Sequence, residues 1–312
     1  YGNFMLIKMQ VGEQDRGELQ VNVTDSDNAP IRDARVTISE PETAINPNSP
    51  IERLETDVSG QTQIVDLNTP PLEYSLNENN ENMPYANYNI QIEAPGYETE
   101  NISNVEILPD SLSLQDVRMR RREGEQVENI DIDPHTLYAE YPEKIPEDEI
   151  KDVNEPGEIV LSRVVIPEYV VVHNGTPSSN ARDYYVTYKD YIKNVASSEI
   201  YATWPRATIE ANVLAIMSFT LNRVYTEWYR NKGYDFTITS STAYDQKWIY
   251  GRNIFQSIDE VVDEIFNQYL SRPDVRQPIL TQYCDGKRVT CPNWLSQWGS
   301  CNLGEQGFGT LE

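Results

Sequence analysis

Glu199 is the residue whose type and position most clearly suit chemistry. It closes an apolar stripe that includes Ile192 and Val195, which recur at helical spacing. A carboxyl group held away from water keeps its proton to a higher pH, so it can act as a general acid near neutral pH. The sequence therefore predicts a proton-donating acid at the end of a helix. The alternative is an acid that caps the helix or pairs at its surface.

Aromatic side chains accompany this acid along the chain. Tyr201 and Trp204 follow it directly, and flat aromatic rings stack well against the apolar C–H faces of sugars. Cleavage of a glycosidic bond requires a proton on the leaving oxygen, and a carboxylic acid commonly supplies it. These residue types therefore suit a site that binds and cleaves a sugar.

Two helices joined by a short elbow at 203–205 must position Glu199. Thr187 and Asp190 have the spacing of a capping box, which predicts where the first helix begins. Pro205 suits the first turn of the second helix, since it lacks an N–H group that would have no partner there. The second helix is apolar on most sides, so we expect it at the centre of a core.

Further elements surround these two helices. A third helix is predicted over 254–270, with Ser257 and Glu260 as its capping box. The runs VVIPEYVVVHNG and DYYVTY read as strands before the helices, and QPILTQY as a buried strand after them. Strands on both sides of a helical centre predict an α+β domain over 161–312.

The first half of the chain carries a different pattern. GELQVNVTD, ARVTIS and YANYNIQIE alternate apolar and polar residues, as strands with one buried face do. Ser59-Gly60 is a hairpin signal within LETDVSGQTQIVDL, and Pro95-Gly96 is a turn. Short strands at regular spacing predict an all-β sandwich over 17–120.

We therefore predict a multidomain chain, with an N-terminal all-β sandwich and a C-terminal α+β domain. Residues 1–16 form an N-terminal segment, whose apolar run MLIKMQV is too short for a secretory signal. Residues 121–160 are rich in proline and acids, which favours an extended connector with little apolar surface to bury.

The net charge of the 312-residue chain limits the classes of partner that it can bind. Fifty acidic against twenty-five basic residues give a formal net charge of −25. Such a chain would be repelled by a phosphate backbone, so we expect no nucleic-acid partner. No apolar run approaches the length of about 20 residues that a membrane helix needs, so we expect no membrane insertion.

The three cysteines lie near the end of the chain, at Cys284, Cys291 and Cys301. Cys284 and Cys291 flank a short loop and would pair in an oxidising compartment, and three reduced thiols are the alternative. A cysteine nucleophile, with His173 rather than His135 as its base, is a rival chemistry. A two-carboxylate glycosidase is another, although no second acid is singled out by its spacing.

Two stretches of the C-terminal half resemble one known family. VASSEIYATWPRATIEANVLAIMSFTLNRVY is similar to the V-A-S-E-M-P-x-x-W-P-x-E-A signature of the stage II sporulation protein D family (SpoIID/LytB). LSQWGSCNLGEQG is similar to that family's M-S-Q-Y-G-A-x-G-x-A-x-x-G. The resemblance implies a SpoIID-like domain at 161–312 that cleaves peptidoglycan glycan strands as a lytic transglycosylase.

The resemblance also implies roles for particular residues. Glu199 corresponds to the family's catalytic glutamate, and Ser296, Gln297 and Trp298 correspond to its S-Q-Y. Tyr283, Lys287 and Trp204 are further candidate contacts to the glycan, with Lys287 orienting a sugar or its lactyl carboxylate. The alternative without a glycan contact is that Trp298 is a core residue and Lys287 is a lone exposed lysine.

No metal or cofactor is expected. Many family members carry a D-x-x-x-x-C-Q-x-Y segment that is associated with zinc in some proteins. The corresponding stretch TITSSTAYDQKWIYG retains Gln246 and Tyr250 but has neither cysteine nor histidine. The family's helical arginine is replaced by Met217, so substrate contacts are expected to differ.

The first half resembles the carboxypeptidase regulatory-like (transthyretin-like) sandwich, through D-x-x-N-x-P-I-x-x-A-x-V, T-D-x-x-G-x-T and Y-x-I-x-x-x-A-P-G-Y. That resemblance implies a stiff spacer or attachment module, with protein partners in an assembly. We therefore expect an extracytoplasmic protein, at a cell surface, spore or particle, that acts on glycan strands. The alternative is a non-catalytic structural or glycan-binding component.

Overall fold

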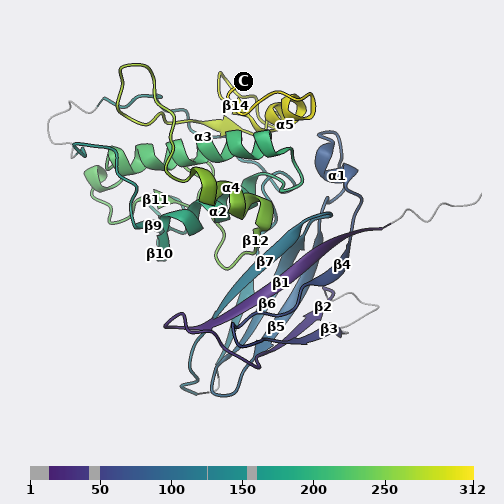
Figure 1. Cartoon of the computed structure of the whole chain (residues 1–312). Helices are drawn as coiled ribbons and strands as arrows, with labels where there is room; N and C mark the ends of the chain where they lie inside the picture. The colour runs from purple at the N-terminus through teal and green to yellow at the C-terminus, as the bar shows by residue number, and fades with distance from the viewer. Residues whose placement is uncertain (1–13, 42–49, 125, 153–159) are drawn as a thin grey trace, which may run out of the picture.

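The computed structural model describes residues 14–41, 50–124, 126–152 and 160–312. Strands fill the first half of the chain, which we call the sheet region (residues 15–131), and helices occupy the centre of the second half. Figure 1 shows the helices packed above one end of the long strands. Most of the predicted N-terminal segment, and residues 153–159 of the predicted connector, lie outside the described residues.

Two sheets build the sheet region. The four-stranded sheet has the order β12-β7-β1-β4, with β1 at Asp15–Asp25, β4 at Val65–Thr69, β7 at Leu112–Met119 and β12 at Ile254–Phe255. The five-stranded sheet has the order β3-β2-β5-β6-β8, with β2 at Arg35–Ser39, β3 at Pro50–Glu55, β5 at Ala86–Glu93, β6 at Thr99–Ile107 and β8 at Val127–Asp131. β1 runs parallel to β7, and β6 runs parallel to β8.

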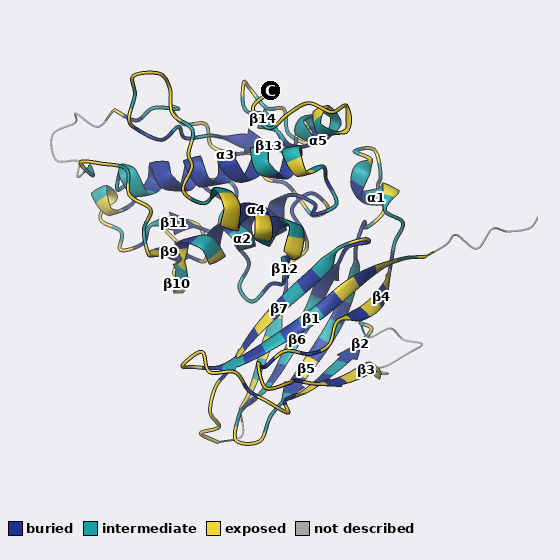
Figure 2. Cartoon of the chain, in the orientation of Figure 1, coloured by how far each residue is buried: buried dark blue, intermediate teal, exposed yellow. Residues whose placement is uncertain are grey.

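Alternating apolar residues explain why the two sheets share a core. Leu19, Val21 and Val23 of β1 are fully buried, as the period-two pattern predicts. They belong to one apolar cluster with residues of the other sheet, among them Ile38 and Ile92. Figure 2 shows these buried positions alternating with exposed ones along the strands.

Two sequence predictions for this region need correction. The turn at Ser59-Gly60 forms, with Gly60 at φ 77°, but it does not join a hairpin. β3 pairs with β2 while β4 pairs with β1, so the chain crosses from one sheet to the other there. Residues 127–131 form strand β8 rather than an extended connector. The predicted boundaries at 17, 120 and 161 stay predictions.

The second half of the chain contains the longer helices and short strands. A three-stranded sheet has the order β10-β9-β11, with β9 at Tyr169–His173, β10 at Asp183–Thr187 and β11 at Ile238–Thr239. The helices are α2 at Tyr188–Glu199, α3 at Arg206–Tyr225, α4 at Gln256–Ile265 and α5 at Gln297–Glu305, with a 3-10 turn at Arg230–Lys232. β13 at Tyr283–Cys284 pairs with β14 at Leu295–Ser296, and the short helix α1 is at Glu73–Leu76.

The predicted helix starts are confirmed at α2 but not at α4. Thr187 caps α2 by accepting a hydrogen bond from the Asp190 N–H at 3.3 Å, and Pro205 stands at the N-cap of α3. α4 has no side-chain cap, because its N-cap is Phe255, which has no acceptor; Ser257 lies inside the helix and donates to the Ala202 carbonyl. Of the strand predicted at QPILTQY, only Tyr283 lies in a strand. α3 is buried along most of its length (Figure 2), as its sequence predicts.

Contacts between the two halves interlock them. β12, from the second half, pairs with β7 of the four-stranded sheet. Arg252 donates to the Glu106 carboxylate at 3.2 Å, and both side chains are almost fully buried. Tyr85 and Leu108 pack into the apolar cluster of the helices. The sheet region therefore contributes to the core around the helices.

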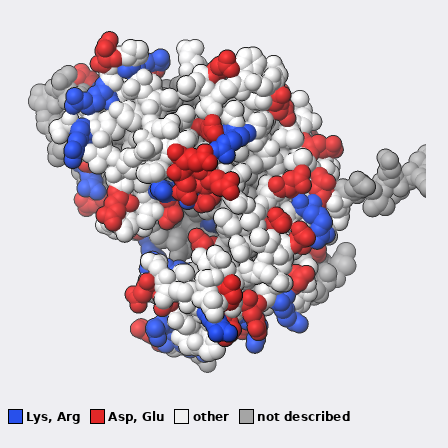
Figure 3. Space-filling model, in the orientation of Figure 1, with Lys and Arg blue, Asp and Glu red and all other residues white. Residues whose placement is uncertain are grey.

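Charge is distributed unevenly over the surface. Figure 3 shows acidic side chains gathered near the middle of one face, over the helices, in the area where α4 lies. α4 has the sequence QSIDEVVDEI and carries no basic residue. Among the described residues, no helix has both the length and the apolar character needed to cross a lipid bilayer.

Breaking the buried Arg252–Glu106 pair should weaken the whole fold. We expect Arg252→Met to lower the free energy of unfolding by about 3–5 kcal/mol, because it leaves a buried carboxylate without its counter-charge. The exposed pair of Arg35 and Glu93 provides the control, and Arg35→Met should cost less than about 1 kcal/mol. Chemical denaturation measures both, and equal losses in the two variants would contradict the interlocking role of Arg252.

Candidate functional site

Glu199 is the last residue of α2 and is only 1% exposed. Ile192 and Val195, on the same helix, are fully buried, as the sequence predicts. The acid therefore sits at the base of the apolar cluster around α2 and α3 rather than at the surface of a helix end. The surface-cap interpretation of Glu199 is wrong.

Two groups from distant parts of the chain bind the carboxylate of Glu199. The Tyr283 hydroxyl donates to Oε2, and the Lys247 backbone N–H donates to Oε1 at 2.8 Å. Burial raises the pKa of Glu199 above its ordinary value, while the positive charge of Lys144 and these two hydrogen bonds act in the opposite direction. Such a carboxyl keeps its proton to a higher pH than an exposed glutamate does.

Residues 135–151, which we call the covering segment, form hydrogen bonds to segments on both sides of Glu199. At one end Thr136 donates to the Ser198 carbonyl at 2.7 Å, next to Glu199 in α2. At the other end the Ile145 N–H donates to the Ala243 carbonyl at 2.8 Å, and Glu147 accepts two hydrogen bonds from Arg223 at 2.8 Å. The covering segment is thus fastened both to α2 and to the loop before Lys247.

Lys144 and Tyr141 are the central residues of the covering segment. The Lys144 ammonium lies 4.0 Å from the centre of the Tyr283 ring, and its Nζ has no hydrogen-bond partner within the described parts of the chain. Burial lowers the pKa of Lys144, and the charge of Glu199 is the main effect that opposes this. The buried Tyr141 hydroxyl likewise lacks a partner there. Lys144, Tyr141 and Tyr283 are thus polar side chains that lie around the buried carboxyl of Glu199.

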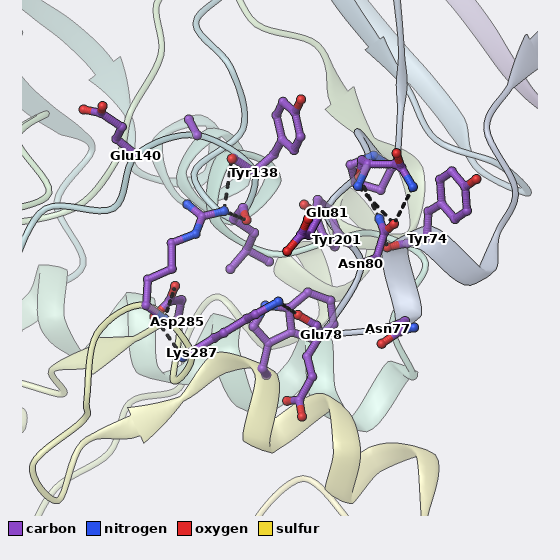
Figure 4. A pocket seen from close by; sticks show the side chains of 16 residues that line it. Tyr74, Asn77, Glu78, Asn80, Glu81, Tyr138, Glu140, Tyr201, Asp285 and Lys287 are labelled. Atoms are coloured by element: carbon purple, nitrogen blue, oxygen red, sulfur yellow. Dashed lines mark hydrogen bonds between the residues drawn. The ribbon is translucent and has the colours of Figure 1, made fainter.

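A cavity of about 670 Å³ lies beside this buried cluster. Figure 4 shows its walls, which come from the α1 loop, the covering segment and the segment after β13. Lys287 reaches across the cavity and donates to the Glu78 carbonyl. Tyr201 and Trp298 form its aromatic floor, and their rings meet edge to face with centroids 6.1 Å apart.

The structure brings some of the predicted contact residues to this cavity and not others. Trp298 and Lys287 line it, and Trp298 is also a buried member of the apolar cluster, as the core-residue alternative predicts. Trp204, which packs against Trp298 with ring centroids 5.1 Å apart, and Tyr283, which is buried on Glu199, do not line it. Ser296 caps α5 through the Gly299 N–H and lines a different, largely apolar cavity beside α3. Gln297 is fully buried, and neither polar atom of its side chain has a partner among the residues described.

The chemistry of the cavity walls matches a polar, uncharged ring system better than an anion. Carboxylates outnumber cations there, with Glu78, Glu81, Glu140 and Asp285 against Lys287 and Arg288. Asp285 is committed to its own turn, since it accepts from the N–H groups of Lys287, Arg288 and Val289. Tyr201 and Trp298 are 2% and 6% exposed, so their rings add little area to the cavity surface. The amide and carboxylate acceptors of the cavity wall suit the hydroxyl groups of a sugar. Glu199 itself does not line this cavity.

The geometry does not support the rival cysteine nucleophile. Cys284 and Cys291 form a disulfide, so neither is a free thiol. The His173 ring nitrogens are engaged by Asp183 at 2.7 Å and by the Ser179 carbonyl at 3.1 Å. Across the described residues, no group of three histidine, cysteine or acidic side chains is arranged to hold a metal ion.

Several residues of the site were missed by the sequence analysis. Lys144, Tyr141 and the backbone of Lys247 surround the acid, and buried Arg223 ties the covering segment to Asp245 through a 2.7 Å bond. The signal for the covering segment was the pair of apolar residues Leu137 and Tyr141 in an otherwise acidic stretch. Leu137 and Tyr141 are both buried.

Comparisons with known proteins leave the family of this chain open. No family model and no curated protein matches it. Among solved structures, the minor pilin GBS52 of Streptococcus agalactiae is 17% identical, with 36% of this chain and 48% of that chain covered and a TM-score of 0.25. Catechol 1,2-dioxygenase of Acinetobacter radioresistens is 13% identical, with 38% and 58% covered and a TM-score of 0.25. The alignments span about half the length of these two proteins, and their TM-scores carry no argument about fold or function.

The hydrogen bond from Tyr283 should stabilise the fold measurably. We expect Tyr283→Phe to lower the free energy of unfolding by about 1–3 kcal/mol, because Oε2 of a buried carboxyl loses its donor. Tyr188→Phe is the matched control, since the Tyr188 hydroxyl is also buried and has no partner in the described chain. Denaturant titration at pH 7 should find Tyr188→Phe close to the wild type. Equal costs for the two variants would show that the bond to Glu199 contributes nothing.

Proposed function

We propose that this chain is a cell-surface, spore or particle protein that cleaves peptidoglycan glycan strands as a lytic transglycosylase. The observation that carries the proposal is the buried carboxyl of Glu199, whose pKa burial raises, next to a cavity with an aromatic floor. The resemblance of its sequence surroundings to the SpoIID family supports the same assignment. No metal or cofactor is part of the proposal.

The proposed reaction uses one acid twice. Protonated Glu199 gives its proton to the oxygen that bridges MurNAc and GlcNAc, the bond from C1 of MurNAc to that oxygen breaks, and the oxygen leaves as a hydroxyl of GlcNAc. The resulting carboxylate then takes the proton from the C6 hydroxyl of the same MurNAc, whose oxygen bonds to C1 and closes the 1,6-anhydro ring. Glu199 regains its proton, so no water is consumed. The Tyr283 hydroxyl holds the carboxyl in place throughout.

A rearrangement must precede this reaction. Glu199 is 1% exposed and does not line the cavity, so a glycan bound there does not touch it in this conformation. The covering segment is the part that must shift, because Lys144 and Tyr141 are packed around the acid. The sheet region would act as a spacer or attachment module in the same protein.

The second candidate is a structural component that binds glycan without cutting it. Complete burial of Glu199 favours this candidate, because buried acids also serve to fix a fold. Binding would then use Trp298, Tyr201 and the polar walls of the cavity alone. The two candidates share a ligand and differ in whether new sugar ends appear.

The decisive comparison is between wild-type protein and Glu199→Gln. We expect wild-type protein to release fragments with 1,6-anhydro ends from purified glycan strands, and Glu199→Gln to release at least a hundredfold fewer. Mass spectrometry of the soluble fragments measures both. Glu260→Gln, which changes an exposed acid on α4, is the control and should match the wild type.

Other outcomes separate the alternatives. Binding of strands by both proteins without any fragments would support the glycan-binding component and contradict catalysis. Equal fragment release by wild type and Glu199→Gln would remove Glu199 from the mechanism. If Trp298→Ala is folded like the wild type but no longer binds glycan strands, the glycan binds in the cavity that Trp298 lines.

A further inference from the structure

A second cavity, of about 470 Å³, lies at the sheet region, and Glu199 does not line it. Its walls come from β6, β7, β8 and the loop that carries Tyr250 and Gly251. β12 pairs with β7 at Ser113 and Leu114, and the cavity is lined by later residues of β7, at 116–118. Nothing in the proposed glycan chemistry uses this cavity.

Glu100 is the unusual residue of this cavity. It lines the cavity, yet its side chain is 2% exposed overall and faces inward from β6 beside Ile102. Its Oε1 has no hydrogen-bond partner among the described residues. A buried carboxylate oxygen without a donor is costly, so a native protein normally supplies one.

The cations near Glu100 are engaged elsewhere. Arg120 donates to Glu128 at 3.1 Å, and Tyr250 donates to the same carboxylate at 3.3 Å. Arg118 donates to the Ser26 carbonyl. Glu128 is thus satisfied, whereas Glu100, its partner across the β6–β8 ladder, is not.

Part of the wall is apolar, and the rest is charged or polar. Ile102, Val117 and Ile130 line the cavity next to Glu100. An alkyl chain of a few carbons fits such a wall, and an ammonium group at its end would give the unpartnered carboxylate three donors. We propose that this cavity is a binding site for an alkylammonium group, held by Glu100 against Ile102, Val117 and Ile130. The inference does not rest on the proposed glycan function.

Other ligand classes fit the cavity less well. A metal ion would need several carboxylates free to converge. Glu128 is already bound to Arg120 and Tyr250, and Asp116, which also lines the cavity, accepts from Asn22 at 3.2 Å. An anion would face an inward carboxylate. A primary ammonium needs only one free carboxylate and an apolar surface beside it for its stem, and Glu100 with its apolar neighbours supplies both.

The charge of Glu100 makes binding depend on pH. Burial, and then the nearby charge of Glu128, raise the pKa of Glu100 to about 7. The charged and titratable groups that face it are Glu98, Asp116, Arg118, Arg120, Glu128 and Tyr250. An alkylammonium stays protonated well above this range, as lysine does. Binding should therefore tighten about tenfold between pH 6 and pH 8, as Glu100 ionises.

Titration of the whole chain with n-pentylammonium chloride tests the inference, with 1-pentanol as the neutral probe of equal length. We expect n-pentylammonium to bind at millimolar concentration, to shift the carboxyl signal of Glu100 in ¹³C NMR spectra, and to bind at least tenfold more weakly to Glu100→Gln. Glu98→Gln, a buried acid two residues away that does not line the cavity, should keep the affinity of the wild type.

Three results would overturn the inference. One is equal binding of the ammonium probe and 1-pentanol, which would make the cavity merely apolar. Another is equal affinity of the wild type and Glu100→Gln for the ammonium probe. The third is no binding at millimolar concentration by a protein whose circular dichroism spectrum is native, which would leave Glu100 as a protonated core residue. Release of glycan fragments is a separate measurement, so failure of either proposal leaves the other standing.

Discussion

The need to accommodate one buried carboxyl group shapes the second half of this chain. Burying an acid is unfavourable unless donors or opposite charges surround it. Glu199 obtains them from three places: the Tyr283 hydroxyl after α4, the Lys247 N–H, and the ammonium of Lys144. The end of α2, β13, the loop at 245–250 and the covering segment must therefore meet at one point, and the aromatic cavity forms beside that point.

Two buried arginines extend this constraint through the molecule by pairing with acids on other segments. Arg223 on α3 binds both Asp245 and Glu147, which fixes the loop before Lys247 and the covering segment to the same helix. Arg252 binds Glu106, which fixes the helices to β6 of the sheet region. Removal of one member of a buried pair leaves the other uncompensated, so the same pairs that hold the segments together also make their movement costly. Any opening of the site around Glu199 has to overcome that cost.

The sequence predicted the elements with strong local signals and missed those that depend on distant partners. The strands of the sheet region follow from alternation, and α2 follows from Thr187 and its apolar stripe. The burial of Glu199 also follows from its place on that stripe. The path of β3 and β4 into different sheets does not follow from Ser59-Gly60, because a turn does not specify the partner of each strand. Lys144 and Tyr141 lie in an acidic, proline-rich stretch, and only their contacts with α2 and Tyr283 explain their burial.

The most direct test of this account is a titration of Glu199 itself, by ¹³C NMR of carboxyl-labelled protein with Glu199→Gln to assign the signal. The account predicts that Glu199 keeps its proton to a pH above that of an ordinary glutamate. It also predicts that Lys144→Met, which removes the nearby positive charge, raises this pH further. A titration like that of an exposed glutamate, unchanged by Lys144→Met, would contradict it.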